Sequence, residues 1–77
     1  MSQSVLEIVE GNRAELTNKE PATRIKALNK INACIKENAL NVREVAVLTE
    51  FYRERLKDTW EVHGAAMEGM LYLVQWG

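Results

Sequence analysis

A chain of 77 residues has room for one small domain, which buries only a modest fraction of its surface on folding. The 47% of hydrophobic residues, together with only four glycines and one proline, exclude a disordered, collagen-like or low-complexity class. Ten basic and eleven acidic residues give a formal net charge of −1, which excludes a broadly basic surface for nucleic acid or anionic membrane.

Two helices are predicted in the first half of the chain, over residues 4–16 and 21–37. Apolar residues recur at helical spacing in both, although Gly11 weakens the first helix by about 1 kcal/mol relative to alanine. Residues 17–20 form a polar break, and Pro21 suits the first turn of the second helix because it lacks an N–H that would be unpaired there. Four basic side chains are expected on the exposed face of this helix: Arg24, Lys26, Lys30 and Lys36.

Two further helices are predicted in the second half of the chain. Asn41, followed three residues later by Glu44, resembles a capping box and predicts that the third helix begins at Val42. Asp58 or Thr59 is expected to cap the fourth helix. The expected inward stripe of the third helix is Val42, Val45, Leu48, Phe51 or Tyr52, and Leu56. The fourth helix carries small residues that permit close approach by another helix, namely Ala65, Ala66 and Gly69.

The two halves repeat one pattern of an apolar helix, a polar turn and a second apolar helix. Ala27 aligns with Ala65 and Ile35 with Leu73, a shift of 38 residues each time (65 − 27 and 73 − 35). This spacing is typical of helical-hairpin repeats of the HEAT and armadillo kind. The sequence therefore predicts an all-α fold of two stacked antiparallel helical hairpins, residues 4–38 and 41–76, within a single domain of residues 1–77.

The last residues, Met70 to Trp76, are nearly all apolar. A helix that is hydrophobic on most sides requires cover on more than one side. We therefore expect further repeats to follow Gly77, in a longer parent protein. The alternative is a small independent helical protein that homodimerises through Met70 to Trp76, which a concentration-dependent mass would reveal.

Chemical motifs are nearly absent. Cys34 and His63 are candidate metal ligands, but no CxxC, HxxxH or HExxH spacing accompanies them. We expect Cys34 to be a small core hydrophobe and His63 to lie at a helix surface or edge. Glu54 and Asp58 share one helical face at four-residue spacing, where salt bridges and capping are their expected roles. The sequence thus predicts no catalytic, cofactor-binding or metal-binding residue, and a protein that is not an enzyme.

Four aromatic residues are candidate anchors for a protein partner, because aromatic side chains are enriched at binding hot spots: Tyr52, Trp60, Tyr72 and Trp76. Tyr52 and Tyr72 are expected to pack between the hairpins. Trp60 lies in the first turn of a helix after a loop and is the expected surface aromatic.

The cellular compartment is predicted from the cysteine content and the apolar runs. Cys34 is the single cysteine, so an oxidised, disulfide-bonded scaffold is not expected. The N-terminus carries acidic residues where a signal peptide would need a basic flank, and no run approaches the roughly 18 apolar residues of a membrane span. These features predict a soluble, intracellular protein that does not bind membranes.

Two segments resemble a known family. Residues 16–24 read Leu-Thr-Asn-Lys-Glu-Pro-Ala-Thr-Arg, and residues 51–58 read Phe-Tyr-Arg-Glu-Arg-Leu-Lys-Asp. The second is followed by a small-residue pattern, Ala-Met-Glu-Gly-Met-Leu, at residues 66–71. In this order they resemble the MMS-nineteen family of HEAT-repeat DNA repair and transcription proteins, with a likeness that extends from about Leu6 to Leu73.

The resemblance implies a non-catalytic adaptor of the cytosolic iron–sulfur protein assembly machinery, present in cytoplasm and nucleus. Such an adaptor brings a targeting complex to iron–sulfur clients such as DNA helicases, polymerases and primase. The contacts of the family with other targeting subunits lie mainly in its C-terminal repeats, so this segment would be the N-terminal end of the solenoid, facing clients. Direct nucleic-acid binding is the weaker alternative, because Arg24, Lys26, Lys30 and Lys36 do not all share one face.

Overall fold

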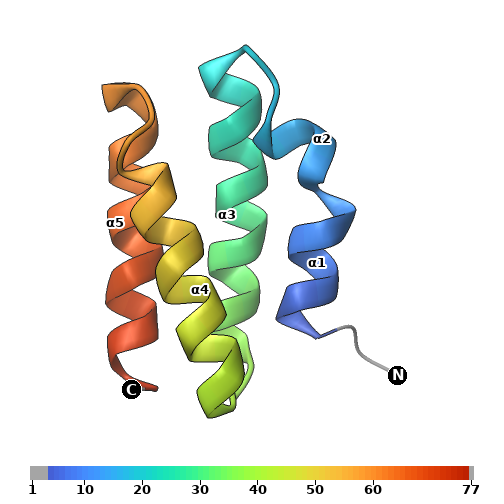
Figure 1. Ribbon diagram of the computed structural model, residues 1–77, viewed down its shortest axis with the longest axis vertical. Helices are drawn as coiled ribbons and strands as arrows, with labels where there is room; N and C mark the ends of the chain where they lie inside the picture. The colour runs from blue at the N-terminus through green and yellow to red at the C-terminus, as the bar shows by residue number, and fades with distance from the viewer. Residues whose placement is uncertain (1–3, 77) are drawn as a thin grey trace.

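The computed structural model describes residues 4–76, and over this range it consists of five α-helices without strands (Figure 1). The helices are α1 (Val5–Gly11), α2 (Arg13–Leu16), α3 (Pro21–Glu37), α4 (Val42–Arg55) and α5 (Trp60–Val74). The predicted all-α class is confirmed. The predicted domain of residues 1–77 also includes Met1 to Gln3 and Gly77, which lie outside the described residues.

The prediction of one continuous helix over residues 4–16 is wrong, because the chain breaks into α1 and α2 at Asn12. Asn12 leaves helical geometry, with φ −107° and ψ 15°, and its side-chain Nδ2 donates to the carbonyl oxygen of Ile8 at 2.8 Å. An asparagine amide that bonds nearby backbone competes with the helical ladder. Gly11 directly before it adds weak helix propensity, so the two residues together end α1.

Capping boxes begin α1 and α4. The amide of Glu44 donates to Asn41 Oδ1 at 2.8 Å, and the Asn41 amide donates to Glu44 Oε1 at 3.0 Å, so the predicted box is confirmed. Ser4 and Glu7 form a second box of the same kind. The expected side-chain cap on α5 is absent from the described structure: Thr59 holds the cap position, but its side chain accepts no hydrogen bond from the α5 backbone.

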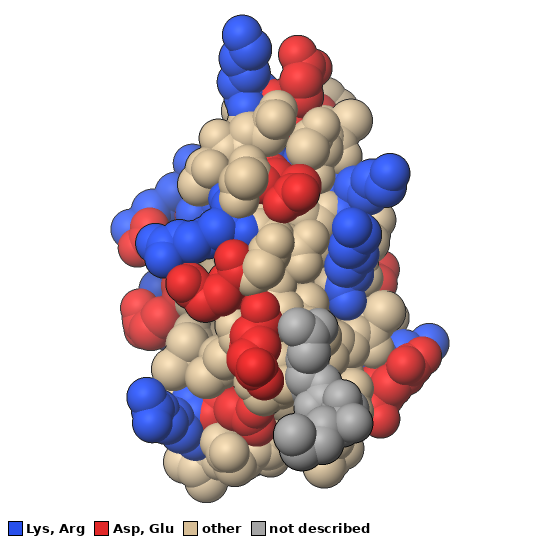
Figure 2. Space-filling view, turned by 90° about the vertical axis from the view of Figure 1, so that its right-hand side faces the viewer, with Lys and Arg blue, Asp and Glu red and all other residues tan. Residues whose placement is uncertain are grey.

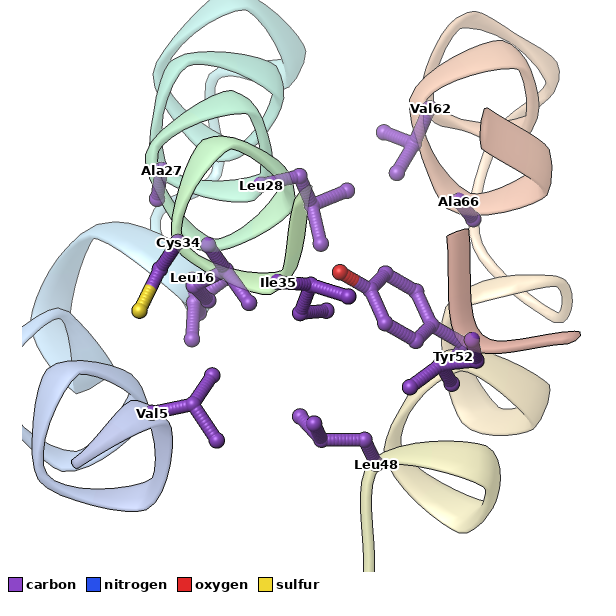
Figure 3. Close-up of a cluster of buried hydrophobic side chains, with 12 residues drawn as sticks. Val5, Leu16, Ala27, Leu28, Cys34, Ile35, Leu48, Tyr52, Val62 and Ala66 are labelled. Carbon is purple, nitrogen blue, oxygen red and sulfur yellow. The ribbon is translucent and has the colours of Figure 1, made fainter. Parts of the chain in front are cut away.

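The helices form two layers (Figures 1 and 3). The second helices of the two hairpins, α3 and α5, run in the same direction side by side and share the most extensive helix–helix contact. The first helices, α1 with α2 and then α4, cover one side of that pair. The fold is therefore a stack of two antiparallel helical hairpins, which the 38-residue shift predicts.

The core lies between the layers. Its buried apolar residues are Val5, Leu16, Ala27, Leu28, Ile31, Cys34, Ile35, Leu48, Tyr52, Val62, Ala66 and Leu73, most of which Figure 3 labels. Most of the inward stripe predicted for α4 is buried or half-buried, but the prediction for Val42 is wrong, because this side chain is 87% exposed. Val42 is the first residue of α4 and lines an open recess with Val45, Ala46 and Trp76 instead of facing the first hairpin.

Candidate functional site

A buried ion pair joins the two hairpins where α3 begins. Arg24 Nη2 donates to Asp58 Oδ1 at 2.8 Å and to Thr59 Oγ1 at 3.3 Å, and Arg24 Nη1 donates to the carbonyl oxygen of Asn18 at 2.6 Å. Arg24 is only 9% exposed, so its predicted place on the exposed face is wrong. The reason is tertiary: the α4–α5 loop brings a carboxylate over this position, and a carboxylate can compensate a buried guanidinium.

The surroundings of Asp58 set its protonation. Partial burial by itself raises the pKa of this carboxyl, but the Thr59 N–H, which donates at 2.6 Å, and the Arg24 guanidinium outweigh burial, with a smaller contribution from Arg55. The net result is a pKa below its usual range. Asp58 therefore stays ionised in the folded chain at pH values where an unfolded chain would already bind a proton.

This lowered pKa predicts an acid-sensitive component of stability. Because the folded pKa lies below the unfolded one, the stabilisation by ionised Asp58 is complete above about pH 4 and is lost as the pH falls through the folded value. We expect the wild type to have a larger free energy of unfolding than Asp58→Asn near neutral pH. This difference should become smaller as the pH falls from about 5 to about 3. Denaturant unfolding of both proteins across this range measures it, and a constant difference would contradict the assignment.

A second polar cluster is buried between α3, α4 and α5. The Tyr52 hydroxyl donates to Asn32 Oδ1, and Asn32 Nδ2 donates to the carbonyl oxygen of Ala65 at 2.9 Å. Gly69 lies directly against the Tyr52 ring. Burial, with smaller contributions from Cys34 and Glu68, raises the pKa of the Tyr52 phenol, so it remains a hydrogen-bond donor.

The sequence interpretation missed Asn32. A signal was present: Asn32 lies four residues after Leu28 and three before Ile35, so it belongs to the buried stripe of α3. A polar residue inside such a stripe requires a partner, because an unsatisfied buried amide destabilises the fold by about 1–3 kcal/mol. Tyr52 and the Ala65 carbonyl supply that partner from the second hairpin.

The candidate metal ligands lie in different surroundings. Cys34 is buried as predicted, its Sγ 3.6 Å from Asn38 Nδ2, and burial raises the pKa of the thiol. His63 is half-buried, with Nε2 2.8 Å from the carbonyl oxygen of Asp58. Within residues 4–76, no group of three or more histidine, cysteine or acidic side chains could hold a metal ion. Glu54 forms an exposed salt bridge with Lys57 at 3.4 Å, as expected.

The basic side chains of α3 differ in exposure. Arg24 is buried, while Lys26, Lys30 and Lys36 are exposed on α3. Lys36 Nζ lies 5.9 Å from the centre of the Tyr72 ring. On the side of the molecule formed by α1 and α2, basic and acidic side chains are interspersed (Figure 2).

The aromatic residues divide between core and surface. Tyr52 is buried and Trp60 is 77% exposed, as predicted for both. Tyr72 is half-buried and its hydroxyl donates to Glu68 Oε2 at 3.2 Å. Trp76 Nε1 donates to the carbonyl oxygen of Ile35 at 3.3 Å, so the end of the second hairpin is bonded back to the first.

The side of the second hairpin opposite the first hairpin is apolar and open. This outer face is defined here by Val45, Leu56, Met67, Met70, Leu71 and Val74. It contains two open recesses of about 220 and 360 Å³, and Leu71 and Val74 are 71% and 74% exposed. Among residues 4–76, no helix has the length and apolar character that a membrane crossing requires. Because Met67, Leu71 and Val74 are all exposed, the outer face is the main exposed apolar surface of the described chain.

Comparison with known proteins gives the family. The family model of the MMS19 N-terminus, described as Dos2-interacting transcription regulator of RNA-Pol-II, matches residues 9–77. The chain is 32% identical over 74 residues to the MMS19 nucleotide excision repair protein homolog of zebrafish, Danio rerio, an alignment that covers 94% of this chain and 7% of the relative. No solved structure matches the chain. Since the family match runs from α1 through α5, the chain belongs to the MMS19 N-terminal family of DNA repair and transcription proteins.

Proposed function

We propose that this chain is a non-catalytic protein-interaction scaffold, equivalent to the N-terminal end of an adaptor that delivers iron–sulfur clusters to client proteins. Its clients would be cytosolic and nuclear proteins of DNA repair, replication and transcription, including DNA helicases and polymerases. Membership in the MMS19 family supports a role in repair and transcription and supports protein partners in general. The adaptor role itself is the proposal.

One structural observation supports the scaffold role: the buried polar and charged side chains form hydrogen bonds with one another across the junction between the hairpins. Arg24 with Asp58, and Asn32 with Tyr52, are joined between hairpins and do not point into an open cavity. The open recesses of the outer face are lined almost entirely by apolar side chains. Such surfaces bind proteins through burial of apolar area.

The family resemblance implies the position of this segment in the adaptor. It implies that the other targeting subunits contact mainly the C-terminal repeats, which leaves the N-terminal region free to contact client proteins. We propose direct contact with clients in cytoplasm and nucleus, without direct contact to nucleic acid. Arg24 is buried in an ion pair with Asp58, so it does not join the exposed lysines of α3 in a basic surface.

A binding assay with a purified iron–sulfur DNA helicase tests the proposal. We expect the immobilised chain to retain the cluster-free helicase and not to retain duplex DNA. The control is Gly69→Ala, which is expected to disrupt the packing between the two hairpins. This variant should no longer retain the helicase. Retention of DNA with an affinity that falls steeply with salt would instead indicate nucleic-acid binding, and failure to retain helicase, polymerase or primase would overturn the client role.

The second candidate function is a small helical protein that homodimerises through Met70 to Trp76. The exposed side chains of Leu71 and Val74 favour it. The mass of the purified chain across a concentration range distinguishes the two, because a dimer gains mass and thermal stability as concentration rises.

A further inference from the structure

We infer that a recess beside Arg55, between the two hairpins, binds an acidic side chain of a protein partner together with an aliphatic residue next to it in the partner's chain. The inference rests on the proposed scaffold role and specifies it, because it names a binding site and the chemistry of the bound segment. The recess lies between α1 with α2 on one side and α4 on the other, and has a volume of about 300 Å³. It shares no lining residue with the outer face.

Arg55 is half-buried and has no carboxylate partner among residues 4–76. By contrast, Arg13, Arg24 and Arg53 each reach a carboxylate oxygen within 3.2 Å. Asp58 is close enough to be influenced by the charge of Arg55, but its carboxylate is bonded to Arg24. A half-buried guanidinium has lost part of its hydration, so an anion placed beside it forms a strong, charge-assisted hydrogen bond.

The N–H groups of Arg55 are only partly satisfied. Nη1 donates to the carbonyl oxygen of Leu16 at 3.3 Å, which is long for such a bond. Nε is enclosed by neighbouring atoms and has no acceptor within the described part of the chain. A guanidinium is rich in N–H donors, so one long bond leaves most of its capacity unused. A carboxylate that enters the recess and accepts from the two Nη groups would use that capacity.

Phe51 fixes the position of the guanidinium. Arg55 Cζ lies 5.6 Å from the centre of the Phe51 ring, one turn earlier on α4, where the ring face attracts a cation. The Phe51 ring itself meets the Tyr52 ring edge to face at 5.1 Å, and Tyr52 is buried in the core. A guanidinium that is already positioned loses less conformational entropy when it binds an anion.

The apolar part of the lining defines the second half of the ligand. Val9, Leu16 and Phe51 contribute apolar side chains to the recess. An aliphatic side chain next to the acidic one would lose contact with water there, which favours binding. The segment that fits is therefore acidic and aliphatic residues side by side, and not an acidic run alone.

The charge of the recess favours a protein segment over nucleic acid. Glu10 is the acidic residue of its lining and is paired with Arg13 at 3.0 Å, so Arg55 supplies the uncompensated charge. One such cation matches a single carboxylate. A nucleic-acid backbone gains its affinity from several basic contacts to successive phosphates, which this lining does not offer.

Peptide titration of the isotopically labelled chain, followed by NMR, tests the inference. The probe is acetyl-Gly-Leu-Glu-Leu-Gly-amide, and the matched probe has glutamine in place of glutamate. We expect the acidic peptide to shift the Nε–H resonance of Arg55 and the backbone amide resonances of Leu16 and Phe51. It should bind about tenfold more tightly than the glutamine peptide, because the hydrogen bonds to a charged acceptor are lost in the latter.

Two variants locate the site. Arg55→Gln should weaken binding of the acidic peptide about tenfold. Arg53→Gln removes the same charge from the same helix, but Arg53 is mostly exposed and does not line the recess, so binding should be unchanged. Circular dichroism checks that both variants fold. If Arg55→Gln does not fold, the response of the Arg55 Nε–H resonance in the wild type decides the outcome.

Each outcome decides the inference. Equal binding of the two peptides, or no shift at Arg55 with the acidic peptide, would overturn it. Inorganic phosphate or single-stranded DNA that shifts the same resonances as strongly would also overturn it, in favour of a general anion site or a nucleic-acid site. Helicase retention is a separate readout. Equal retention by the wild type and Arg55→Gln would remove this site and leave the scaffold role intact, whereas peptide binding without helicase retention would support the site and not the client role.

Discussion

Gly69→Ala is expected to lower the free energy of unfolding by about 2 kcal/mol, even though alanine is the better helix former by about 1 kcal/mol. A Cβ on Gly69 would lie 2.5 Å from Asn32 Oδ1 and closer still to the Tyr52 ring. Neither neighbour can move freely, because the Tyr52 hydroxyl and the Asn32 amide are bonded to each other inside the core. In a domain of this size such a loss is a large part of the total stability.

Gly64→Ala is the matched control. It lies in the same helix, but a Cβ there would meet no atom within 4 Å. We expect it to stabilise the chain by up to about 1 kcal/mol through helix propensity. Denaturant unfolding followed by circular dichroism compares the two variants. Equal effects at both positions would refute the close approach of α5 to α4.

Arg24→Met is expected to destabilise the fold by about 3 kcal/mol, because it leaves the carboxylate of Asp58 largely desolvated without its cation. The side chains of the pair are only 11% and 17% exposed, so solvent screens their interaction weakly. The double variant Arg24→Met with Asp58→Leu should lose less free energy of unfolding than the two single variants lose together, because no uncompensated charge remains in it. Urea unfolding of the two single variants and the double variant measures this coupling.

The exposed pair of Arg53 and Glu50 provides the comparison. Its atoms are 3.2 Å apart, but both side chains lie mostly in solvent. Arg53→Met should therefore change the free energy of unfolding by less than about 0.5 kcal/mol. An Arg24→Met effect no larger than that of Arg53→Met would mean that the buried pair does not hold the hairpins together.

Gly69 and Arg24, the residues with the largest expected effects, both lie at the junction between the hairpins. Arg24 fixes one end of α3 to the loop before α5, and Asn32 with Tyr52 fixes its middle. Trp76 bonds the far end of the second hairpin to Ile35. Three polar contacts along one junction set the register of the stack, since a shift of either hairpin would leave buried polar groups unpaired.

Much of the fold could be predicted from local patterns. Asn41 and Glu44 mark the start of α4 because a capping box satisfies orphan amides within four residues of chain. Pro21 marks the start of α3 because its ring prevents an earlier helical continuation. The 38-residue repeat predicts the hairpin stack, because equal apolar stripes at equal spacing bury each other best when stacked. The family resemblance, confirmed over residues 9–77, rests on the same local segments.

Partners distant in the chain could not be predicted in this way. By sequence Arg24 belongs to a basic row, and only the loop 34 residues later makes it a buried member of an ion pair. Gly69 was predicted to permit a close helix approach, but which side chain fills the space, Tyr52, is decided by how α4 packs. Helical periodicity tells which side of a helix is apolar, whereas the partner of each polar group depends on the relative placement of helices. That placement is set by the packing of both hairpins together, so only the tertiary structure decides it.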